Sequence, residues 1–334
     1  MSNIDKLLND LTLKEKVLLL SGFDAWHTNK IERLNIPSIK MSDGPNGVRG
    51  DGNSGKSSAC FPSAISLGSS WNMNLINRLG VELGEEAKTK DADVLLGPTI
   101  NIHRHPLGGR HFESFSEDPY LTGRIAIEYV NGVQEENVAA CLKHFVGNDT
   151  EYERYAVSSN IDEKTLREIY LLPFEMAIKQ ANAKVVMSAY NKLNNIYCSS
   201  HRNLLIDILK NEWGFEGYVV SDWGAALETI ENANGGLDLE MPGPAKNWGA
   251  LLEEAVNEAG KVGHHHHLHQ KKKKTKSVLA RSCLQCVMRM QRQLWHWWKR
   301  KPVPTAGRKM EREAVHCRWH WKNSTSTMIL MRRS

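Results

Sequence analysis

The stretch VAACLKH (residues 138–144) places five small or apolar residues directly before a lysine and a histidine. A short apolar run of this kind is typical of a strand buried in a parallel sheet. Similar runs predict strands at residues 38–41, 93–96, 138–142, 184–188, 218–221 and 237–239. Helical periodicity lies between them, at residues 74–88, 118–135, 163–181 and 202–212. This alternation predicts an α/β fold with a parallel sheet, open or closed.

Polar side chains follow the predicted strands. In chain order they are Asp43, Arg110 with His111, Lys143 with His144, Tyr190 with Asn191, Asp222 with Trp223, and Glu240. (β/α)8 barrels build their sites at the carboxyl ends of successive strands, and about 250 residues is an ordinary barrel length. An open doubly wound sheet also binds ligands there, but no G-x-G-x-x-G motif follows any strand. The sequence therefore favours a TIM-like (β/α)8 barrel, with the completeness of its eighth strand and helix left open.

The composition is that of a globular protein. Of the 334 residues, 41% are hydrophobic and 24% are charged. The chain has no apolar run long enough to cross a membrane, and its first residues, MSNIDKLLNDLTLKEK, lack the apolar core of a secretory signal. Six cysteines in a chain of this length do not form a disulfide framework. We therefore expect a protein of the reducing cytoplasm with no membrane partner.

The chain divides sharply by composition near residue 261. Residues 262–334 contain 18 lysines and arginines against two acidic residues, Glu311 and Glu313, and they hold five of the ten tryptophans. Eight of the fourteen histidines also lie there, whereas every Asp, Tyr and Phe lies earlier. We therefore expect a folded barrel domain over 1–261 and a basic, disordered tail over 262–334.

Three interpretations of this tail remain. The run HHHHLH and the lysines after it resemble a metal-binding or nucleic-acid-binding tail, or a purification tag placed within the chain. The loss of three residue types alongside a gain in Trp, His, Arg and Lys favours out-of-frame translation. Whatever its origin, such a tail would bind nucleic acid non-specifically through its charge.

Individual polar residues have structural as well as functional interpretations. Asp222 follows the apolar run 217–220, where a carboxylate is costly unless it is paired or used, but it would also suit the start of a helix. Lys143 and His144 are adjacent in a strand, so we expect their side chains to point to opposite faces. Arg110, in a loop with two glycines, would suit either a substrate or a surface ion pair.

Three histidines, His103, His105 and His111, lie close together in the sequence. Metal sites need a further set of ligands at suitable spacing, which the sequence around them lacks. We interpret them as loop histidines and expect no metal.

Several long motifs are too specific to be chance. They are MSDGPNGVRG (41–50), GPTINIHRHPLGGRHFESFSEDPYLTG (97–123), CLKHFVGNDTEYER (141–154), AVSSNIDEKTLREIYLLPFEMA (156–177), VVMSAYNKLN (185–194) and GYVVSDWGA (217–225). Together they resemble the N-terminal domain of glycoside hydrolase family 3 β-glucosidases, the fungal and yeast members above all. The resemblance covers about residues 3–261 and ends where the composition changes.

The resemblance implies hydrolysis of terminal β-D-glucosyl residues with retention of configuration, on β-glucosides such as cello-oligosaccharides or aryl glucosides. Retention requires a nucleophile and an acid/base, two carboxyl groups about 5–5.5 Å apart. The family's nucleophile lies in the S-D-W motif, which here gives Asp222. The residues that hold the glucosyl unit correspond to Asp43, Arg110, Lys143, His144 and Tyr190, and Trp223 offers an apolar wall. The resemblance implies no metal or organic cofactor.

In β-glucosidases of this type the acid/base glutamate comes from a second, α/β-sandwich domain, and nothing after residue 261 resembles that domain. We therefore expect the acid/base glutamate to be absent from this chain and hydrolysis of natural glucosides to be impaired. One alternative is a single-domain β-N-acetylhexosaminidase, but residues 146–152 (VGNDTEY) lack the acid loop of those relatives. Another is a non-catalytic barrel with a polyanion-binding tail.

Overall fold

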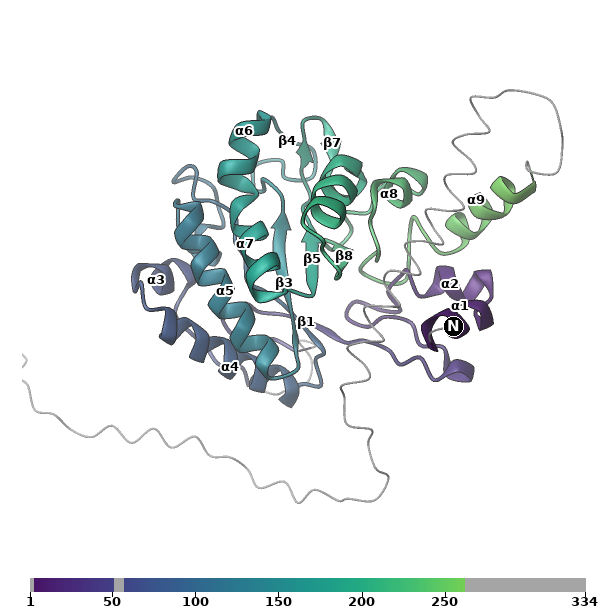
Figure 1. The fold of residues 1–334 in the computed structure, drawn as a ribbon, viewed down its shortest axis with the longest axis horizontal. Coiled ribbons are helices and arrows are strands. Elements are labelled where there is room, and N and C mark those ends of the chain that lie inside the picture. The colour runs from purple at the N-terminus through teal and green to yellow at the C-terminus, as the bar shows by residue number, and fades with distance from the viewer. Residues whose placement is uncertain (1–2, 51–56, 262–334) are drawn as a thin grey trace, which may run out of the picture. The chain divides into compact units, whose positions relative to one another are not determined.

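A parallel sheet lies at the centre of the structure, a computed structural model that describes residues 3–50 and 57–261 (Figure 1). Its five strands follow the order β1-β2-β3-β5-β8, and every neighbouring pair is parallel. The strands are β1 (Met41–Asp43), β2 (Val94–Leu96), β3 (Ala139–Phe145), β5 (Val185–Ser188) and β8 (Tyr218–Ser221). The predicted α/β class and parallel sheet are confirmed. The predicted tail, 262–334, lies outside the described residues.

Three of the predicted strands differ clearly from the observed ones. β3 ends at Phe145, three residues after the predicted end at 142. β1 begins three residues later than predicted, because Ile39 and Lys40 pair with the preceding segment: Thr28 N donates to Ile39 O at 3.0 Å, and His27 bridges Lys40 in antiparallel fashion. The predicted strand at 237–239 makes a single parallel bridge, between Leu239 and Val220.

Isolated backbone bridges continue the sheet beyond β8. After Leu239, Glu240 bridges Ser21 in parallel, and Gly22 bridges Thr28 in antiparallel fashion. Gly22 N also donates to Glu240 O at 2.9 Å. The sheet is therefore curled, and the N-terminal segment lies against residues more than 200 positions later in the chain.

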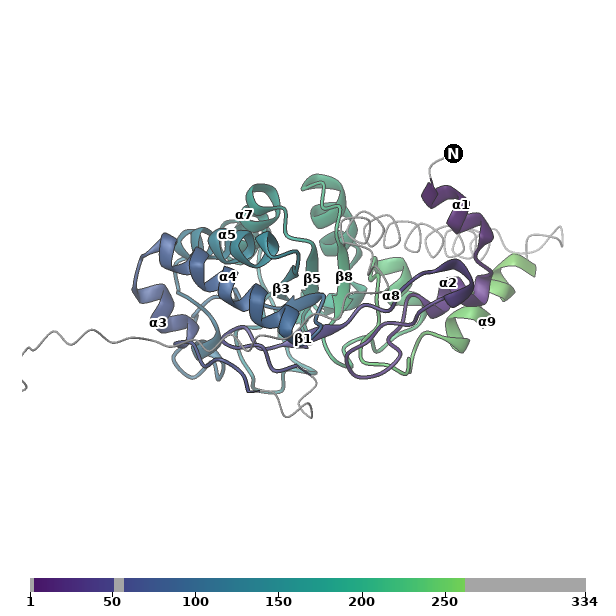
Figure 2. The same cartoon turned by 90° about the horizontal axis from the view of Figure 1, so that it is seen from below.

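Three long helices lie side by side along one face of the sheet (Figures 1 and 2): α4 (Met73–Thr89), α5 (Pro119–Glu135) and α7 (Leu172–Ala181). α4 and α5 each begin with an N-cap residue. The side chains of Asn72 and Asp118 accept hydrogen bonds from the backbone N–H groups three residues later. Gly80 and Gly132 allow α4 and α5 to approach closely. A Cβ atom on Gly80 would lie 2.6 Å from Tyr129 O.

The helix predicted at 163–181 is interrupted. It consists of α6 (Glu163–Thr165), the π-helical turn η3 (Leu166–Tyr170) and α7. Leu171 N donates to Leu166 O, five residues back, at 2.8 Å. Pro173 has no N–H and cannot continue the regular pattern, so a wider turn precedes it. The helix predicted at 202–212 is also π-helical, as η5 (Asn203–Glu212).

The other elements are short or peripheral. A second sheet of β4 (Ser158–Ser159), β6 (Lys192–Leu193) and β7 (Ile196–Tyr197) lies in the loops. The remaining helices are α1 (Asn3–Asp10), α2 (Leu13–Leu18), η1 (Glu32–Leu34), α3 (Ala64–Ser69), η2 (His111–Glu113), η4 (Cys198–Ser200), α8 (Ile230–Gly235) and α9 (Ala250–Lys261). None of the helices in the described ranges is both long and apolar enough to span a bilayer.

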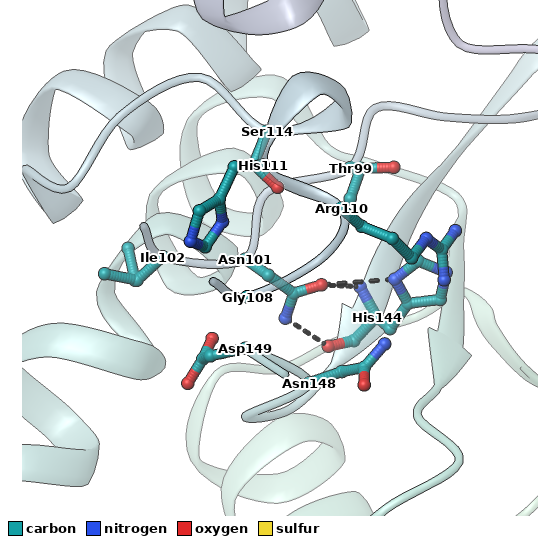
Figure 3. Close-up of a pocket in the computed structure, with 10 residues that line it drawn as sticks. All are labelled: Thr99, Asn101, Ile102, Gly108, Arg110, His111, Ser114, His144, Asn148 and Asp149. Atoms are coloured by element: carbon teal, nitrogen blue, oxygen red, sulfur yellow. Dashed lines mark hydrogen bonds between the residues drawn. The ribbon is translucent and has the colours of Figure 1, made fainter. Parts of the chain in front are cut away.

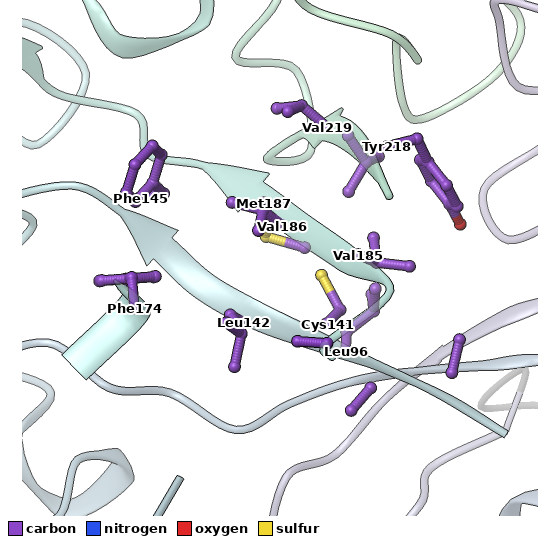
Figure 4. Close-up of a cluster of buried hydrophobic side chains, with 14 of the residues drawn as sticks. Leu96, Cys141, Leu142, Phe145, Phe174, Val185, Val186, Met187, Tyr218 and Val219 are labelled. Atoms are coloured by element: carbon purple, nitrogen blue, oxygen red, sulfur yellow. The ribbon is translucent and has the colours of Figure 1, made fainter. Parts of the chain in front are cut away.

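The core lies between the sheet and these helices (Figure 4). Val185 and Val186 are fully buried in it, and the Phe145 ring packs edge-on against Phe174 at 4.9 Å between centroids. A strand that is buried on both faces has a continuous run of apolar residues, and such runs allowed these strands to be predicted from the sequence.

A buried ion pair joins η5 to the segment after α8. Lys210 Nζ lies 2.7 Å from Asp238 Oδ2, and their side chains are 2% and 0% exposed. Lys210 Nζ also donates to Gly236 O at 2.6 Å, and Asp238 Oδ2 accepts from Val219 N at 2.8 Å. These contacts fix the edge of the sheet beside β8.

Candidate active site

A cavity of about 190 Å³ opens at the carboxyl ends of the strands. Eleven residues line it: Trp26, Asp43, Leu96, Arg110, Lys143, His144, Arg154, Met187, Tyr190, Asp222 and Trp223. All seven predicted site residues are among them, although they come from five separate parts of the chain. The parallel sheet explains this convergence, since it brings the ends of its strands to one edge.

Lys143 and His144 both line this cavity, so the prediction that they point to opposite faces is wrong. The register of β3 against β5 shifts between Leu142 and Phe145. Such an irregularity interrupts the alternation of side chains along a strand and can turn two neighbours to the same side.

Asp43 and Lys143 form an ion pair at the cavity. Lys143 Nζ lies 2.7 Å from Asp43 Oδ1, and Arg49 approaches the other carboxylate oxygen at 3.5 Å. Burial by itself raises the pKa of Asp43, but the two nearby cations outweigh it, so the pKa is lowered. Asp43 is therefore a permanent carboxylate that can accept hydrogen bonds, beside an ammonium that can donate them.

Asp222 is 7% exposed, and its two carboxylate oxygens differ in their contacts. Its Oδ1 accepts from Trp223 N at 2.8 Å, whereas Oδ2 has no hydrogen-bond partner in the described structure. Burial raises the pKa of Asp222, although the Trp223 amide and Lys143 oppose the shift. No helix starts directly after Asp222, because α8 begins only at Ile230. The helix-capping interpretation of Asp222 therefore has no helix to cap.

His144 is held by Asn101 (Figure 3). Asn101 Oδ1 lies 2.8 Å from His144 N and 3.1 Å from His144 Nδ1, and Asn101 Nδ2 donates to His144 O at 2.9 Å. Burial, then Arg110 and Lys143, hold the pKa of His144 well below its usual value, so its ring is neutral at physiological pH. With Nδ1–H directed at the amide oxygen, Nε2 is an acceptor and lies 3.6 Å from Asp222 Oδ2.

Two arginines complete the polar wall. Arg110 pairs with Glu113 at 2.8 Å and approaches Glu151 at 3.6 Å. Arg154, which sequence reasoning did not assign to the site, pairs with Glu151 at 2.6 Å and lies over the Tyr190 ring, 4.7 Å from its centroid. The shared Glu151 fixes both guanidinium groups, and its position in the quoted motif 141–154 was the available signal.

Aromatic side chains also line the cavity. Tyr190 donates its hydroxyl hydrogen to Trp223 O at 2.9 Å, and Trp223 Nε1 donates to Ala25 O at 2.8 Å. The Trp26 ring lies 5.5 Å from the Trp223 ring. Sequence reasoning missed Trp26, because no strand or motif there marks it as part of the site.

A smaller pocket shares Arg110 and His144 with the cavity (Figure 3). It includes Asp149, whose pKa burial raises to about 7. The predicted loop histidines lie nearby: the rings of His103 and His111 are 4.7 Å apart, and His103 Nε2 contacts Ser114 O at 3.0 Å. Within residues 3–50 and 57–261, no three His, Cys, Asp or Glu side chains gather as metal ligands would.

The chain is similar in sequence and in fold to known β-glucosidases. The chain is 57% identical over 261 residues to a β-glucosidase of Rhizobium radiobacter, and 51% identical over 268 residues to thermostable β-glucosidase B of Acetivibrio thermocellus. Among solved structures, the glucose complex of Kluyveromyces marxianus β-glucosidase matches with a TM-score of 0.77 at 42% identity. That match covers 89% of this chain and 35% of the yeast protein.

These alignments cover 78% of this chain but only 32% and 35% of the two bacterial proteins. The chain therefore spans about a third of the length of the curated relatives it matches. Residues 12–281 match the sequence model of the glycosyl hydrolase family 3 N-terminal domain. Because that match covers most of its residues, the chain belongs to glycosyl hydrolase family 3.

Proposed function

We propose that this chain forms the glucose-binding and nucleophile-bearing part of a retaining β-glucosidase, with Asp222 as the nucleophile. One observation carries the proposal: Asp222 Oδ2 is buried at the cavity without a hydrogen-bond partner in the described structure. A buried carboxylate oxygen without a partner is costly to the fold, and an incoming electrophilic carbon would give it a use. The β-glucosidase names of the relatives and the glucose bound in the yeast structure support the same substrate class.

The polar wall suits the hydroxyl groups of a terminal glucosyl ring. Lys143 and Arg110 can donate hydrogen bonds, Asp43 can accept them, and neutral His144 offers the Nε2 lone pair. Trp223 and Tyr190 give apolar surface for the face of the ring. The cavity of about 190 Å³ can hold a small ligand such as a single sugar ring.

The chemical step needs no metal or redox partner. Asp222 Oδ2 attacks the anomeric carbon and forms an ester bond, while the bond to the leaving oxygen breaks and that oxygen keeps the electron pair. A proton donor must neutralise this oxygen when the leaving group is a poor one. Water then cleaves the ester and releases glucose with its configuration retained.

The described lining of the cavity offers no suitable proton donor. Among the described residues that line the cavity, the carboxyl groups belong to Asp43 and Asp222 alone. The lowered pKa of Asp43 makes it a poor acid, because it stays ionised beside Lys143. We therefore propose that the donor comes from outside the described residues, and that this chain by itself is weak on natural glucosides, since general acid catalysis contributes about 10²–10⁴-fold.

We also propose that the curled sheet belongs to a TIM-like (β/α)8 barrel within the predicted domain 1–261. The five strands, the segment at Leu239–Glu240 and the two N-terminal segments at 21–22 and 27–28 make eight backbone segments. The segment 27–28 is antiparallel to both of its neighbours, through the bridges from Gly22 to Thr28 and from His27 to Lys40. This barrel therefore departs from the regular parallel arrangement at that segment.

The test is the intact mass of the chain after incubation with a 2-deoxy-2-fluoro-β-glucoside that carries a dinitrophenolate leaving group. This leaving group needs little proton donation, and the fluorine slows hydrolysis of the ester. We expect one fluoroglucosyl adduct on the wild-type chain and none on Asp222→Ala. Asp207→Ala, which removes an exposed carboxylate on η5, serves as the matched control and should label normally. A folded chain without an adduct, or an adduct that persists in Asp222→Ala, would overturn the assignment.

A further inference from the structure

An exposed tyrosine lies at the rim of the cavity. Tyr155 is 56% exposed, yet its ring packs edge-on against the cavity residue Tyr190, with 4.6 Å between centroids. Arg154, also a cavity residue, lies 5.0 Å from the Tyr155 centroid. Tyr155 is therefore exposed to solvent and in contact with the lining of the cavity.

The position of this ring is held by its neighbours. Arg154 Nη2 donates to the Tyr155 hydroxyl oxygen at 2.9 Å, and Arg154 Nη1 donates to Glu151 Oε2 at 2.6 Å. Single exposed aromatic residues are common on proteins and need no explanation. Here, however, two ring contacts and a hydrogen bond hold an exposed ring, so binding a ligand to it would cost little ordering entropy.

The same loop provides a comparison. Tyr152 is 75% exposed and precedes Tyr155 by three residues. Its backbone N–H donates to Thr150 Oγ1 at 3.3 Å. Neither tyrosine is itself among the residues that line the cavity, but within the described residues only the Tyr155 ring contacts two of them, Tyr190 and Arg154. Tyr152 therefore matches Tyr155 in residue type, loop and exposure, but not in its contact with the site.

The position of Tyr155 suits the part of a glucoside that extends out of the cavity. A glucosyl ring that fills the cavity, as proposed above, leaves its aglycone outside it. Tyr155 is exposed and contacts two residues of the cavity lining, Tyr190 and Arg154, so its ring is available to an aglycone that extends past them.

We infer that Tyr155, braced by Arg154 and Tyr190, is a binding surface for the first ring of the aglycone. It would favour aglycones with a flat or ring-shaped apolar face, aryl groups and sugar rings, over short alkyl groups. The inference rests on the proposed function, since it assigns a role to a residue at the rim of the same site.

The experiment compares two ligands that differ only in the aglycone: phenyl and methyl 1-thio-β-D-glucoside, whose sulfur bridge resists hydrolysis. Isothermal titration calorimetry gives both dissociation constants for the wild-type chain and for Tyr155→Ala, Tyr155→Phe and Tyr152→Ala. We expect Tyr155→Ala to weaken binding of the phenyl glucoside roughly 2- to 10-fold, as for the loss of one aromatic contact, and to leave the methyl glucoside unchanged. Tyr155→Phe and Tyr152→Ala should keep the wild-type ratio.

The other outcomes are distinct. An unchanged ratio in Tyr155→Ala, or an equal fall in Tyr152→Ala, overturns the inference and leaves the glucose site intact. A loss in Tyr155→Phe equal to that in Tyr155→Ala overturns it as well, because the hydroxyl contact with Arg154 would then matter and not the ring. A wild-type chain that binds neither glucoside refutes the proposed function, and this inference falls with it.

Discussion

Replacing Lys210 by methionine removes one partner of the buried ion pair and leaves the other in place. Asp238, with a side chain 0% exposed, would keep the Val219 amide but lose the ammonium that balances its charge. Gly236 O would lose its hydrogen bond as well. Breaking a buried pair in this way costs about 3–5 kcal/mol, a large share of the roughly 5–15 kcal/mol that stabilises a typical protein.

Urea denaturation followed by tryptophan fluorescence measures the effect. Lys179→Met serves as the matched control, because Lys179 pairs with Glu175 on the surface of α7, where both side chains are about a third or more exposed. Surface pairs of this spacing contribute only about 0.3–0.5 kcal/mol. Adding Asp238→Asn to Lys210→Met should restore part of the loss, since the amide oxygen can still accept from Val219 N. Equal midpoints for Lys210→Met and Lys179→Met would refute the reasoning.

Three further predictions concern the site and the helices. Asn101→Ala should lower the free energy of unfolding by about 1–3 kcal/mol, because it leaves the buried N–H donors of His144 unsatisfied. An unchanged urea midpoint together with an unchanged His144 Nδ1 signal in ¹⁵N NMR would contradict this. The labelling rate with the activated fluoroglucoside should rise with pH, because only the ionised form of Asp222 attacks and the pKa of Asp222 is raised. A midpoint of the rate–pH curve at or below the ordinary aspartate pKa of about 3.9 would contradict this. Gly80→Ala should destabilise the contact between α4 and α5 by about 1–3 kcal/mol, since the new Cβ would lie 2.6 Å from Tyr129 O. A melting temperature equal to that of the wild type would rule out this close approach.

The sequence predicted that the site residues lie close together, because the ends of the strands could be located from their apolar runs. Asp43, Lys143 and Asp222 each follow an apolar run, and a parallel sheet brings such ends together. Arg154 and Trp26 were not predicted, because they reach the cavity from loops whose path depends on tertiary contacts, namely Glu151 for one and the Trp223 ring for the other.

The fold was predicted less well where one local rule overrode another. Periodicity made 163–181 one helix, but Pro173 lies inside it and a π-helical turn precedes the proline. Alternation placed Lys143 and His144 on opposite faces, but the register shift in β3 places both at the cavity. Such irregularities depend on neighbouring strands and helices, and a pattern read along one segment does not contain them.

The hydrogen bond from Trp223 Nε1 to Ala25 O joins residues 198 positions apart. On the ribosome, at about 5–20 residues per second, the partners are synthesised ~10–40 s apart. The N-terminal segment around Ser21 therefore leaves the exit tunnel long before Glu240, which it pairs with in the sheet. In the meantime its apolar residues, among them Leu19 and Leu20, lack the distant part of the chain that pairs with this segment in the folded protein. This segment therefore waits longest for its native contacts.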